Sequence, residues 1–403
     1  MTAHITSISI SGLRTLDEFK LELGGLTVLI GENGSGKSSV IEAFELLRRL
    51  TTNEFSRSYS QIHGGDGLLL RIGSEEIRLL VELSKPDSWK ATYDVAFSMN
   101  GIQSERILVC MSGSAWYEPV SRTSGRVITT PRTGFDRLEY EISLYESALS
   151  RTLHPDKAVL DVIDALRQID VQLPFDTLAH WAARSQGYRI PPMRDSVTVA
   201  PSPELERFGA NLPNAYFALR NESSRDEWEY TMELVRMGLG EWIESVNTRS
   251  DAGGGKIGLW IKAQYTDVQI PAASLSDGQL AYLAFVALTQ LRSERSILCF
   301  DELETHLHPR LLTTVLGLLE KVAENVPVLI TTHSRRLLDA LEDPAKSVRV
   351  LELNPQTLRT EMYKLDASAL ESWLQNYEGL GRILDAGYRE SFLAESASEG
   401  SDA

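Results

Sequence analysis

The sequence predicts an α/β fold: a mixed sheet that carries a phosphate-binding loop, an antiparallel β subdomain and a compact helical insertion. Two observations predict the sheet. The apolar run 26–30 leads through a glycine-rich loop into a helical pattern from Ser38 to about Leu50, and helix and strand patterns alternate from Gln279 to Leu341. Short strand patterns separated by turn residues between 60 and 135 are typical of an antiparallel sheet.

The individual elements follow from hydrophobic periodicity. Alternation predicts strands near 5–10 and 19–23, and the subdomain strands are expected at 68–72, 77–81, 93–97 and 107–109. From 138 to 250 the periodicity is helical, and several prolines there argue against a long coiled coil. Further strands are expected at 257–261, 265–270, 297–300 and 328–331, and further helices at 279–291, 311–323 and 335–341.

These patterns divide the chain into four parts. Residues 1–135 form the first half of the sheet-bearing domain, 136–255 a mainly helical insertion or lid, and 256–390 the second half. Residues 391–403 are small, polar and acidic, so we expect a disordered tail.

Composition excludes several classes of protein. The only two cysteines in 403 residues, Cys110 and Cys299, exclude a disulfide framework, and the expected compartment is a reducing cytoplasm. We find neither a targeting signal nor an apolar run of membrane-spanning length. Lys plus Arg number 40 against 56 Asp plus Glu, a net charge of −16. Any contact with DNA would therefore need a local patch or an assembly.

Residues 31–38 fit the phosphate-binding pattern G-x-x-x-x-G-K-[ST], with a strand before and a helix after. The glycines let backbone N–H groups converge on phosphate oxygens, and the helix adds the positive end of its dipole. Lys37 is expected to reach the β- and γ-phosphates and Ser38 to hold Mg²⁺. The alternative is a glycine-rich turn that binds nothing. The expected nucleotide contacts are Gly31, Glu32, Asn33, Gly34, Ser35, Gly36, Lys37, Ser38 and Ser39.

A second motif, 296–302, is an apolar strand pattern that ends in two acids. Asp301 is expected to face the phosphate-binding loop and bind the hydration shell of magnesium, and Glu302 to act as the general base on the attacking water. Taken alone, the two acids are as well explained as caps of the next helix. Their combination with the loop favours catalysis.

A third motif begins the predicted helix at 279. Alone it predicts a helix N-cap, whose exposed N–H groups can bind an anion. Together with the other motifs it resembles the LSGGQ signature of ABC-type ATPases, with Asp277 in place of the first glycine. The residues of this motif are Ser276, Asp277, Gly278 and Gln279.

Two further polar residues are suggested by the same resemblance. His333 ends the strand that follows Asp301, where ABC-type ATPases place a switch histidine that contacts the γ-phosphate. Gln61 lies beyond the first helix, where a Q-loop glutamine contacts nucleotide and metal; the alternative is a surface glutamine.

The four motifs in this order resemble the ABC-type ATPases of the SMC, RecF and OLD-related group. The segments 8–14 and 26–38 look like the N-terminus of that group. The run 301–309 looks like the D-E-P-E-x-x-L-H-P run of OLD-related, AAA-labelled ATPases, with Leu303 in place of the proline. The resemblance implies ATP and Mg²⁺ as ligands, with Arg14 contacting nucleotide in its own subunit.

The resemblance also implies that two ATPase domains meet head to tail, with each ATP between one P-loop and the signature of the partner. A complete site then requires a homodimer or a higher even assembly. The residues that act from the first subunit are Lys37, Ser38, Asp301, Glu302 and His333. Those that act from the other are Ser276, Gly278 and Gln279.

The expected function is an ATP-dependent sensor or scaffold in prokaryotic anti-phage defence. The stretch after Ser334 is too short for the Toprim nuclease that OLD-related proteins often carry, so we expect a separately encoded effector protein. One alternative is a RecF-like DNA-repair or chromosome-maintenance ATPase that clamps DNA; another is a nucleotide-binding switch with negligible turnover. His306 and His308 suggest either a metal site or, as family-like residues, part of the dimer interface.

Overall fold

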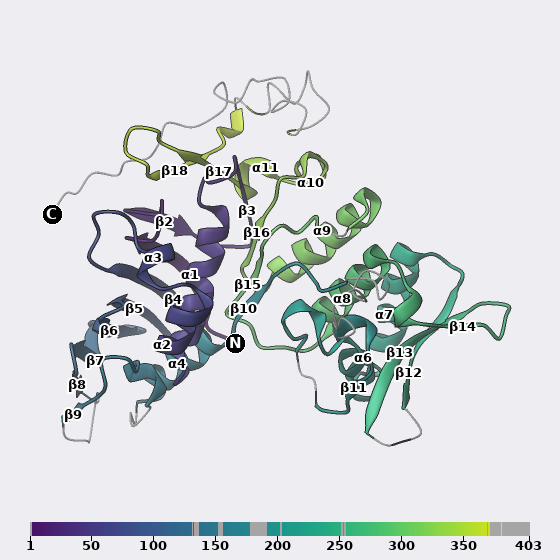
Figure 1. The fold of residues 1–403 in the computed structure, drawn as a ribbon, viewed down its shortest axis with the longest axis horizontal. Helices are drawn as coiled ribbons and strands as arrows, with labels where there is room; N and C mark the ends of the chain where they lie inside the picture. Colours follow the sequence, from purple (N-terminus) through teal and green to yellow (C-terminus); the bar gives the residue numbers. More distant parts are fainter. Residues whose placement is uncertain are drawn as a thin grey trace.

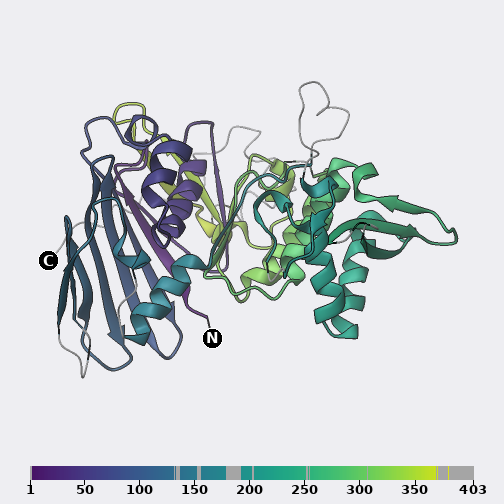
Figure 2. The same cartoon turned by 60° about the horizontal axis from the view of Figure 1, so that its bottom comes forward.

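The computed structural model of the chain describes residues 2–130, 132, 137–151, 156–177, 192–201, 204–250, 253, 255–305, 307–368, 370 and 380. The predicted acidic tail, 391–403, lies outside the described residues. Figures 1 and 2 show a central sheet, a larger antiparallel sheet on one side of it and a helical lobe with a small sheet on the other.

Six strands form the central sheet, in the spatial order β10 (Ile169–Gln172), β15 (Ile297–Phe300), β16 (Val328–Thr331), β3 (Leu26–Gly31), β17 (Val348–Leu353) and β18 (Thr360–Lys364). Neighbours are parallel except β17 and β18, so the sheet is mixed, as predicted. Leu29 and Cys299 face one core, and Val28 and Phe300 face the other. Burial on both faces explains why these strands are apolar without alternation.

Eight antiparallel strands form the larger sheet, in the order β2 (Phe19–Glu22), β1 (His4–Ser11), β4 (Ile77–Lys85), β5 (Trp89–Ser98), β6 (Gly101–Met111), β7 (Tyr117–Thr123), β8 (Arg126–Thr129) and β9 (Leu138–Glu141). The predicted strands 77–81, 93–97 and 107–109 fall within β4, β5 and β6. The antiparallel β subdomain is therefore confirmed.

Helix α1 (Lys37–Leu50) connects these two sheets. Val40, Phe44 and Leu47 recur at helical spacing, and all three are buried in the core that the larger sheet shares with one face of the central sheet. Helix α4 (Lys157–Arg167) contributes to the same core. The start of α1 is thereby fixed at the carboxyl end of β3.

The expected strand at 68–72 is wrong. The chain there forms helix α3 (Asp66–Leu69), and Leu70 makes only an isolated bridge to Leu13. Leu68 and Ile72 are 68% and 98% exposed, so this apolar run is not a buried strand. Asp66 anchors the segment because its carboxylate accepts hydrogen bonds from the Tyr59 hydroxyl and from a backbone N–H of the loop after β5.

The helical lobe contains α6 (Leu212–Glu222), α7 (Arg225–Leu239), α8 (Asp277–Gln290) and α9 (Pro309–Ala323), with a sheet of β11 (Val197–Thr198), β12 (Ile243–Ser250), β13 (Lys256–Ala263) and β14 (Gln269–Pro271). Helix α8 contacts α6, α7 and α9, and the side chains of 280–288 are all buried. The expected strand 265–270 is shorter than predicted, because Tyr265 takes a positive φ of 60° in the turn before β14.

The structure divides the segment 136–255, expected as a mainly helical insertion, among all three sheets. Strand β9 ends the larger sheet, β10 is an edge of the central sheet, and β11 and β12 belong to the small sheet. Strand β10 has only four residues, which alternate between apolar and polar, and so short an alternation does not distinguish a strand from a helix. Helices α6 and α7 are the described helices of this segment that lie in the lobe.

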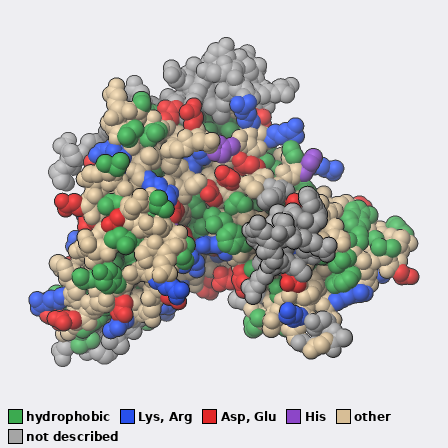
Figure 3. All heavy atoms as spheres, in the orientation of Figure 1, with side chains coloured by type: hydrophobic (Ala, Val, Ile, Leu, Met, Phe, Trp, Pro, Cys, Tyr) green, Lys and Arg blue, Asp and Glu red, His purple; other side chains and the backbone are tan. Residues whose placement is uncertain are grey.

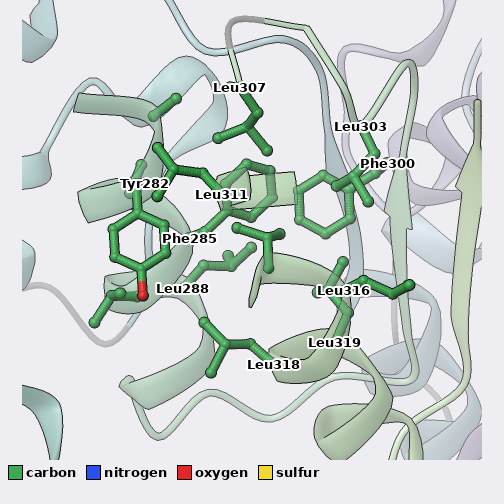
Figure 4. Close-up of a cluster of buried hydrophobic side chains, with 14 of the residues drawn as sticks. Tyr282, Phe285, Leu288, Phe300, Leu303, Leu307, Leu311, Leu316, Leu318 and Leu319 are labelled. Carbon is green, nitrogen blue, oxygen red and sulfur yellow. The ribbon is translucent and has the colours of Figure 1, made fainter. Parts of the chain in front are cut away.

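A cluster of apolar side chains joins α8 to the central sheet (Figure 4). The rings of Phe285 on α8 and Phe300 on β15 have centroids 5.2 Å apart. Leu303, which stands where the resemblance expects proline, is 2% exposed in this cluster. Its N–H donates to the Thr331 carbonyl (3.2 Å), a hydrogen bond that proline lacks the donor to make.

The remaining described helices are short. They are α2 (Phe55–Arg57), a π-helical turn (Ser58–Ile62), α10 (Arg335–Asp339), α11 (Pro344–Ser347) and the 3-10 turns Ala148–Ser150, Pro192–Arg194, Arg207–Gly209 and Ala272–Ser274. Among the described helices, none combines the length and apolar character needed to cross a bilayer. The predicted helices at 279–291, 311–323 and 335–341 and the strands at 297–300 and 328–331 are confirmed within a few residues.

Replacing Phe285 by alanine tests whether this cluster joins α8 to β15. Phe285 is 3% exposed, so we expect the Phe285→Ala variant to lose about 3–5 kcal/mol of unfolding free energy. Phe217→Ala on α6, where the ring is 37% exposed, should lose less than about 1 kcal/mol. Urea denaturation followed by fluorescence measures both; equal losses would contradict the packing described.

Candidate nucleotide-binding site

The P-loop, 31–38, connects the carboxyl end of β3 to α1. Lys37 is 6% exposed, and its Nζ donates to the carbonyl oxygens of Gly31 and Glu32, both at 2.9 Å. Burial lowers the pKa of the Lys37 ammonium. Three carboxylates act in the opposite direction: Asp301, Glu302 and Glu304. A desolvated cation beside backbone N–H groups is suited to bind an anion.

Glycine is required at position 36 for steric reasons. Gly36 has a φ of 96°, and a Cβ there would lie 2.7 Å from Oγ1 of Thr360. The Thr360 hydroxyl lies 3.0 Å from the Ser35 carbonyl oxygen and 2.8 Å from Oγ1 of Thr15. Strand β18 therefore supports the loop from behind, a contact between residues far apart in sequence that no motif indicated.

Ser38, Asp301 and Thr331 meet at the carboxyl edge of the central sheet. The Ser38 hydroxyl donates to Oδ1 of Asp301 at 3.0 Å, and the Thr331 hydroxyl donates to the same oxygen at 2.7 Å. A hydroxyl and a carboxylate held together are the oxygen ligands that Mg²⁺ prefers. The residues present thus fit the metal that the sequence predicts.

Glu302 follows Asp301 in a strained backbone conformation. Its φ is 50°, in the left-handed region that costs a non-glycine residue about 1 kcal/mol or more. Two hydrogen bonds to Thr331 hold it: the Glu302 N–H donates to Oγ1 (2.8 Å), and the Leu303 N–H donates to the carbonyl. Thr331 therefore positions both predicted acids, although sequence analysis gave it no role.

Glu304 fixes the turn that carries His333. Its two carboxylate oxygens accept hydrogen bonds from the Thr332 hydroxyl (2.8 Å) and from the His333 N–H. The His333 side chain is exposed and lines the same cavity as Lys37. Glu304 lies in the acidic run after β15, and this position is the one sequence feature that pointed to a role in the site.

A cavity of about 400 Å³ opens at the P-loop. Arg14 reaches this cavity, where its guanidinium donates to Ser39 Oγ (3.1 Å) and pairs with Glu42 (2.7 Å). Of the predicted site residues, Gly31, Glu32, Ser35 and Asp301 support the cavity through the contacts described above. Those that line it are Arg14, Asn33, Gly34, Gly36, Lys37, Ser38, Ser39, Glu302 and His333.

The structure does not bring Gln61 to this cavity. The π-helical turn leaves Gln61 exposed, and its side-chain oxygen accepts a hydrogen bond from Arg57 at 3.1 Å. Among the described residues that line the cavity, Gln61 is absent. The expected contacts of Gln61 with nucleotide and metal stay a prediction, and the alternative of a surface glutamine fits its exposed position.

The signature residues lie at the start of α8. Ser276 and Gln279 form a capping box: the Ser276 hydroxyl accepts from the Gln279 N–H, and the Ser276 N–H donates to Oε1 of Gln279. Ser276 is exposed. In the described part of the chain, 276–279 line no part of the P-loop cavity, and α1 and α8 lie on opposite sides of the central sheet (Figures 1 and 2).

Asp277, the first residue of α8, is paired with an arginine. Its Oδ1 accepts a hydrogen bond from the buried guanidinium of Arg194 at 2.6 Å. Sequence analysis missed Arg194, and no motif surrounds it.

The two histidines after β15 are not supported as a metal site. His308 caps α9, with Nδ1 accepting from the Arg310 N–H at 3.3 Å. His306 lies outside the described residues. No group of three His, Cys, Asp or Glu residues that could hold a metal ion occurs within the described ranges.

Removing one hydroxyl tests the role of Thr331. We expect Thr331→Val to reduce the rate of ATP hydrolysis at least about tenfold, because it leaves the Glu302 N–H without its acceptor and removes one of the two hydroxyl donors to Asp301. Phosphate release measures the rate. The matched control is Thr289→Val on α8, whose hydroxyl bonds only to its own helix and should leave the rate unchanged. Equal rates for both variants would contradict this role.

Comparisons with known proteins agree with these motifs. The family model described as "AAA domain, putative AbiEii toxin, Type IV TA system" matches residues 128–339, more than half of the chain, and a model described as "AAA ATPase domain" matches 4–103. No curated protein matches the sequence.

Solved structures similar to the chain include SMC head domains. A head bound to the C-terminal winged-helix domain of ScpA is 12% identical, covering 90% of this chain and 98% of that chain, with a TM-score of 0.48. The head domain from Thermotoga maritima is 11% identical, covering 90% and 99%, with a TM-score of 0.44. A head with an extended coiled coil, bound to the C-terminal domain of ScpA derived from Pyrococcus furiosus, is 12% identical, covering 96% and 100%, with a TM-score of 0.48.

Motifs, sheet order and family models lead to one conclusion. The fold is that of an ABC-type P-loop ATPase with an antiparallel β subdomain. The chain belongs to the AAA-labelled ATPase family described as "AAA domain, putative AbiEii toxin, Type IV TA system".

Proposed function

We propose that the chain is a Mg²⁺-dependent ATPase whose complete ATP sites form between two copies of the chain. Each P-loop cavity would receive ATP, and the Ser276 end of α8 of a second copy would close over the γ-phosphate. ATP then holds the dimer together, and hydrolysis releases it.

The distance between the P-loop cavity and the signature within one chain supports this proposal most directly; we call these two parts the half-sites. Lys37, Asp301 and His333 are gathered around one cavity, whereas Ser276 is exposed at the start of α8 across the central sheet. An exposed helix N-terminus with a capping serine is suited to bind an anion, but within the described part of its own chain it does not meet the P-loop cavity. A second copy arranged head to tail supplies that site.

Each residue in the cavity has a distinct task. Lys37 binds β- and γ-phosphate oxygens, and Ser38 with Asp301 holds Mg²⁺, which when bound neutralises phosphate charge. Glu302 accepts the proton of the attacking water as general base. His333 contacts the γ-phosphate, and its turn is fixed by Glu304.

For biological role, we propose an ATP-dependent sensor or scaffold in prokaryotic anti-phage defence that acts on a separately encoded effector. The family description supports a defence-related role, because it names a toxin and a "Type IV TA system". Nucleotide-dependent dimerisation would provide the two states that such a sensor needs, one with and one without the effector engaged.

A clamp on duplex DNA is the rival function. A hollow in the helical lobe favours it, since Arg220 and Arg249 line this hollow with Asn247 and Gln269, and no acid lies among the described lining residues. The net charge of −16 weighs against it, and Lys and Arg side chains alternate with Asp and Glu over the face in Figure 3. Turnover stimulated by duplex DNA would favour the clamp; turnover independent of DNA supports the scaffold.

Replacing the general base tests the proposal. We expect Glu302→Gln to lower ATP turnover at least about a hundredfold while ATP still binds, so that dimers accumulate in ATP and not in ADP. Analytical ultracentrifugation measures the dimer, and phosphate release measures the turnover. The matched control is Glu244→Gln, an exposed carboxylate on β12 paired with Lys262, which should change neither. If turnover and oligomeric state of Glu302→Gln equal those of the unmodified chain, the proposed mechanism is wrong.

A further inference from the structure

The signature of this chain contains a carboxylate, that of Asp277, at the helix end that is proposed to bind a negatively charged phosphate. Asp277 is the first residue of α8, and the proposed site brings the γ-phosphate of the partner's ATP to this helix end. An unpaired carboxylate there would repel the phosphate. Something in the chain has to offset this charge if the site is to close on ATP.

Arg194 lies directly against Asp277. The guanidinium side chain is 3% exposed, and its Nη2 donates to Oδ1 of Asp277 at 2.6 Å. The guanidinium also donates to three backbone carbonyls. Its Nη1 donates to those of Ala273 (3.0 Å) and Leu275 (2.6 Å), just before the signature, and its Nε donates to that of Thr177 (2.9 Å). Every nitrogen of the fork has an acceptor.

These contacts have two physical consequences. A buried guanidinium needs a counter-charge, and Asp277 supplies it, so neither charge remains uncompensated. The bonds to Ala273 and Leu275 fix the backbone immediately before Ser276 and thus the direction in which α8 starts. Lysine has no planar fork and would not reach these acceptors together.

We propose that Arg194 is a positioning residue for the signature: it neutralises Asp277 and holds the chain before Ser276, so that Ser276 faces the γ-phosphate of a second copy. This inference rests on the proposed composite ATP site. It explains why the chain carries aspartate at this position without losing an anion site, because Asp277 and Arg194 form one neutral unit beside the helix end.

Arg194 is remote from the P-loop cavity, which gives the test its selectivity. It lines no part of that cavity among the described residues. Replacing Arg194 should therefore leave ATP binding to the monomer unchanged and affect only the step in which the signature meets the partner. A residue that merely stabilised the fold would lower both.

The experiment compares Arg194→Met with the double variant Arg194→Met, Asp277→Gly, both in the Glu302→Gln background. We expect Arg194→Met to raise the ATP concentration needed for half-maximal dimerisation at least about tenfold, because Asp277 is left unpaired. ATP affinity of the monomer, measured at high dilution with a fluorescent analogue, should change less than about twofold. The double variant should recover most of the dimerisation, because it removes the repelling charge.

Two further variants complete the design. Arg194→Lys keeps the charge without the fork and should weaken dimerisation to an intermediate degree; it also keeps the test valid if Arg194→Met fails to fold, which thermal unfolding reveals. Lys262→Met, which breaks an exposed ion pair with Glu244 in the same lobe, is the matched control and should have no effect on dimerisation.

The outcomes separate the two proposals. If the Glu302→Gln reference forms no dimer in ATP, the composite site itself is wrong, and the role of Arg194 falls with it. If the reference forms dimers and both Arg194 variants do so equally well, the positioning role alone is overturned. A loss of dimerisation that Asp277→Gly does not relieve would contradict the neutralisation of Asp277.

Discussion

The contact of Asp301 with Ser38 and Thr331 is the interaction on which the rest of the site depends. It joins the ends of β3, β15 and β16, which are far apart in sequence but meet because parallel strands present their carboxyl ends at one edge of a sheet. The Thr331 hydroxyl accepts the N–H of Glu302 and so holds its strained φ, and the Thr332 hydroxyl donates to Glu304, which fixes the turn before His333. The central sheet thus sets the geometry of the acids and of the His333 turn at its carboxyl edge.

The same sheet connects this edge to the signature. Phe300, the residue before Asp301, packs on Phe285 of α8, and Leu303 fills the same cluster. Because helix α8 is buried along most of its length, its packing against the sheet fixes the direction of its exposed end. Arg194 further fixes the backbone just before Ser276 through its hydrogen bonds to Ala273 and Leu275. Packed side chains thus connect α8 to β15 and to Asp301 and Glu302 at its carboxyl end.

Much of this arrangement was predictable from the sequence, for reasons that differ between elements. The P-loop, Asp301, Glu302 and His333 each follow a short strand that is buried along its length and almost wholly apolar. The local pattern therefore indicated both their secondary structure and their common edge. Glu304 belongs to the run 301–309 that the resemblance identified, but the sequence did not indicate that it fixes the His333 turn. Thr331, Thr360 and Arg194 act through contacts between distant segments, which local pattern does not encode.

The wrong and incomplete predictions have the same origin. The run 68–72 is apolar but exposed, and β10 is too short for its period to be recognised. Gln61 was placed by its position beyond α1; a π-helical turn leaves it exposed and outside the described cavity lining, so its nucleotide contact stays a prediction. In each case burial, which sequence pattern reports only indirectly, decided the structure.

The central claim, that each ATP site is shared between two copies, is tested most directly by mixing two inactive variants. Lys37→Ala disables the P-loop, and Ser276→Arg disables the signature. Because each mixed dimer holds one intact pair of half-sites, an equimolar mixture should recover about a quarter of the wild-type ATP turnover, while each variant alone stays inactive. A mixture that hydrolyses no more ATP than either variant alone would contradict the account.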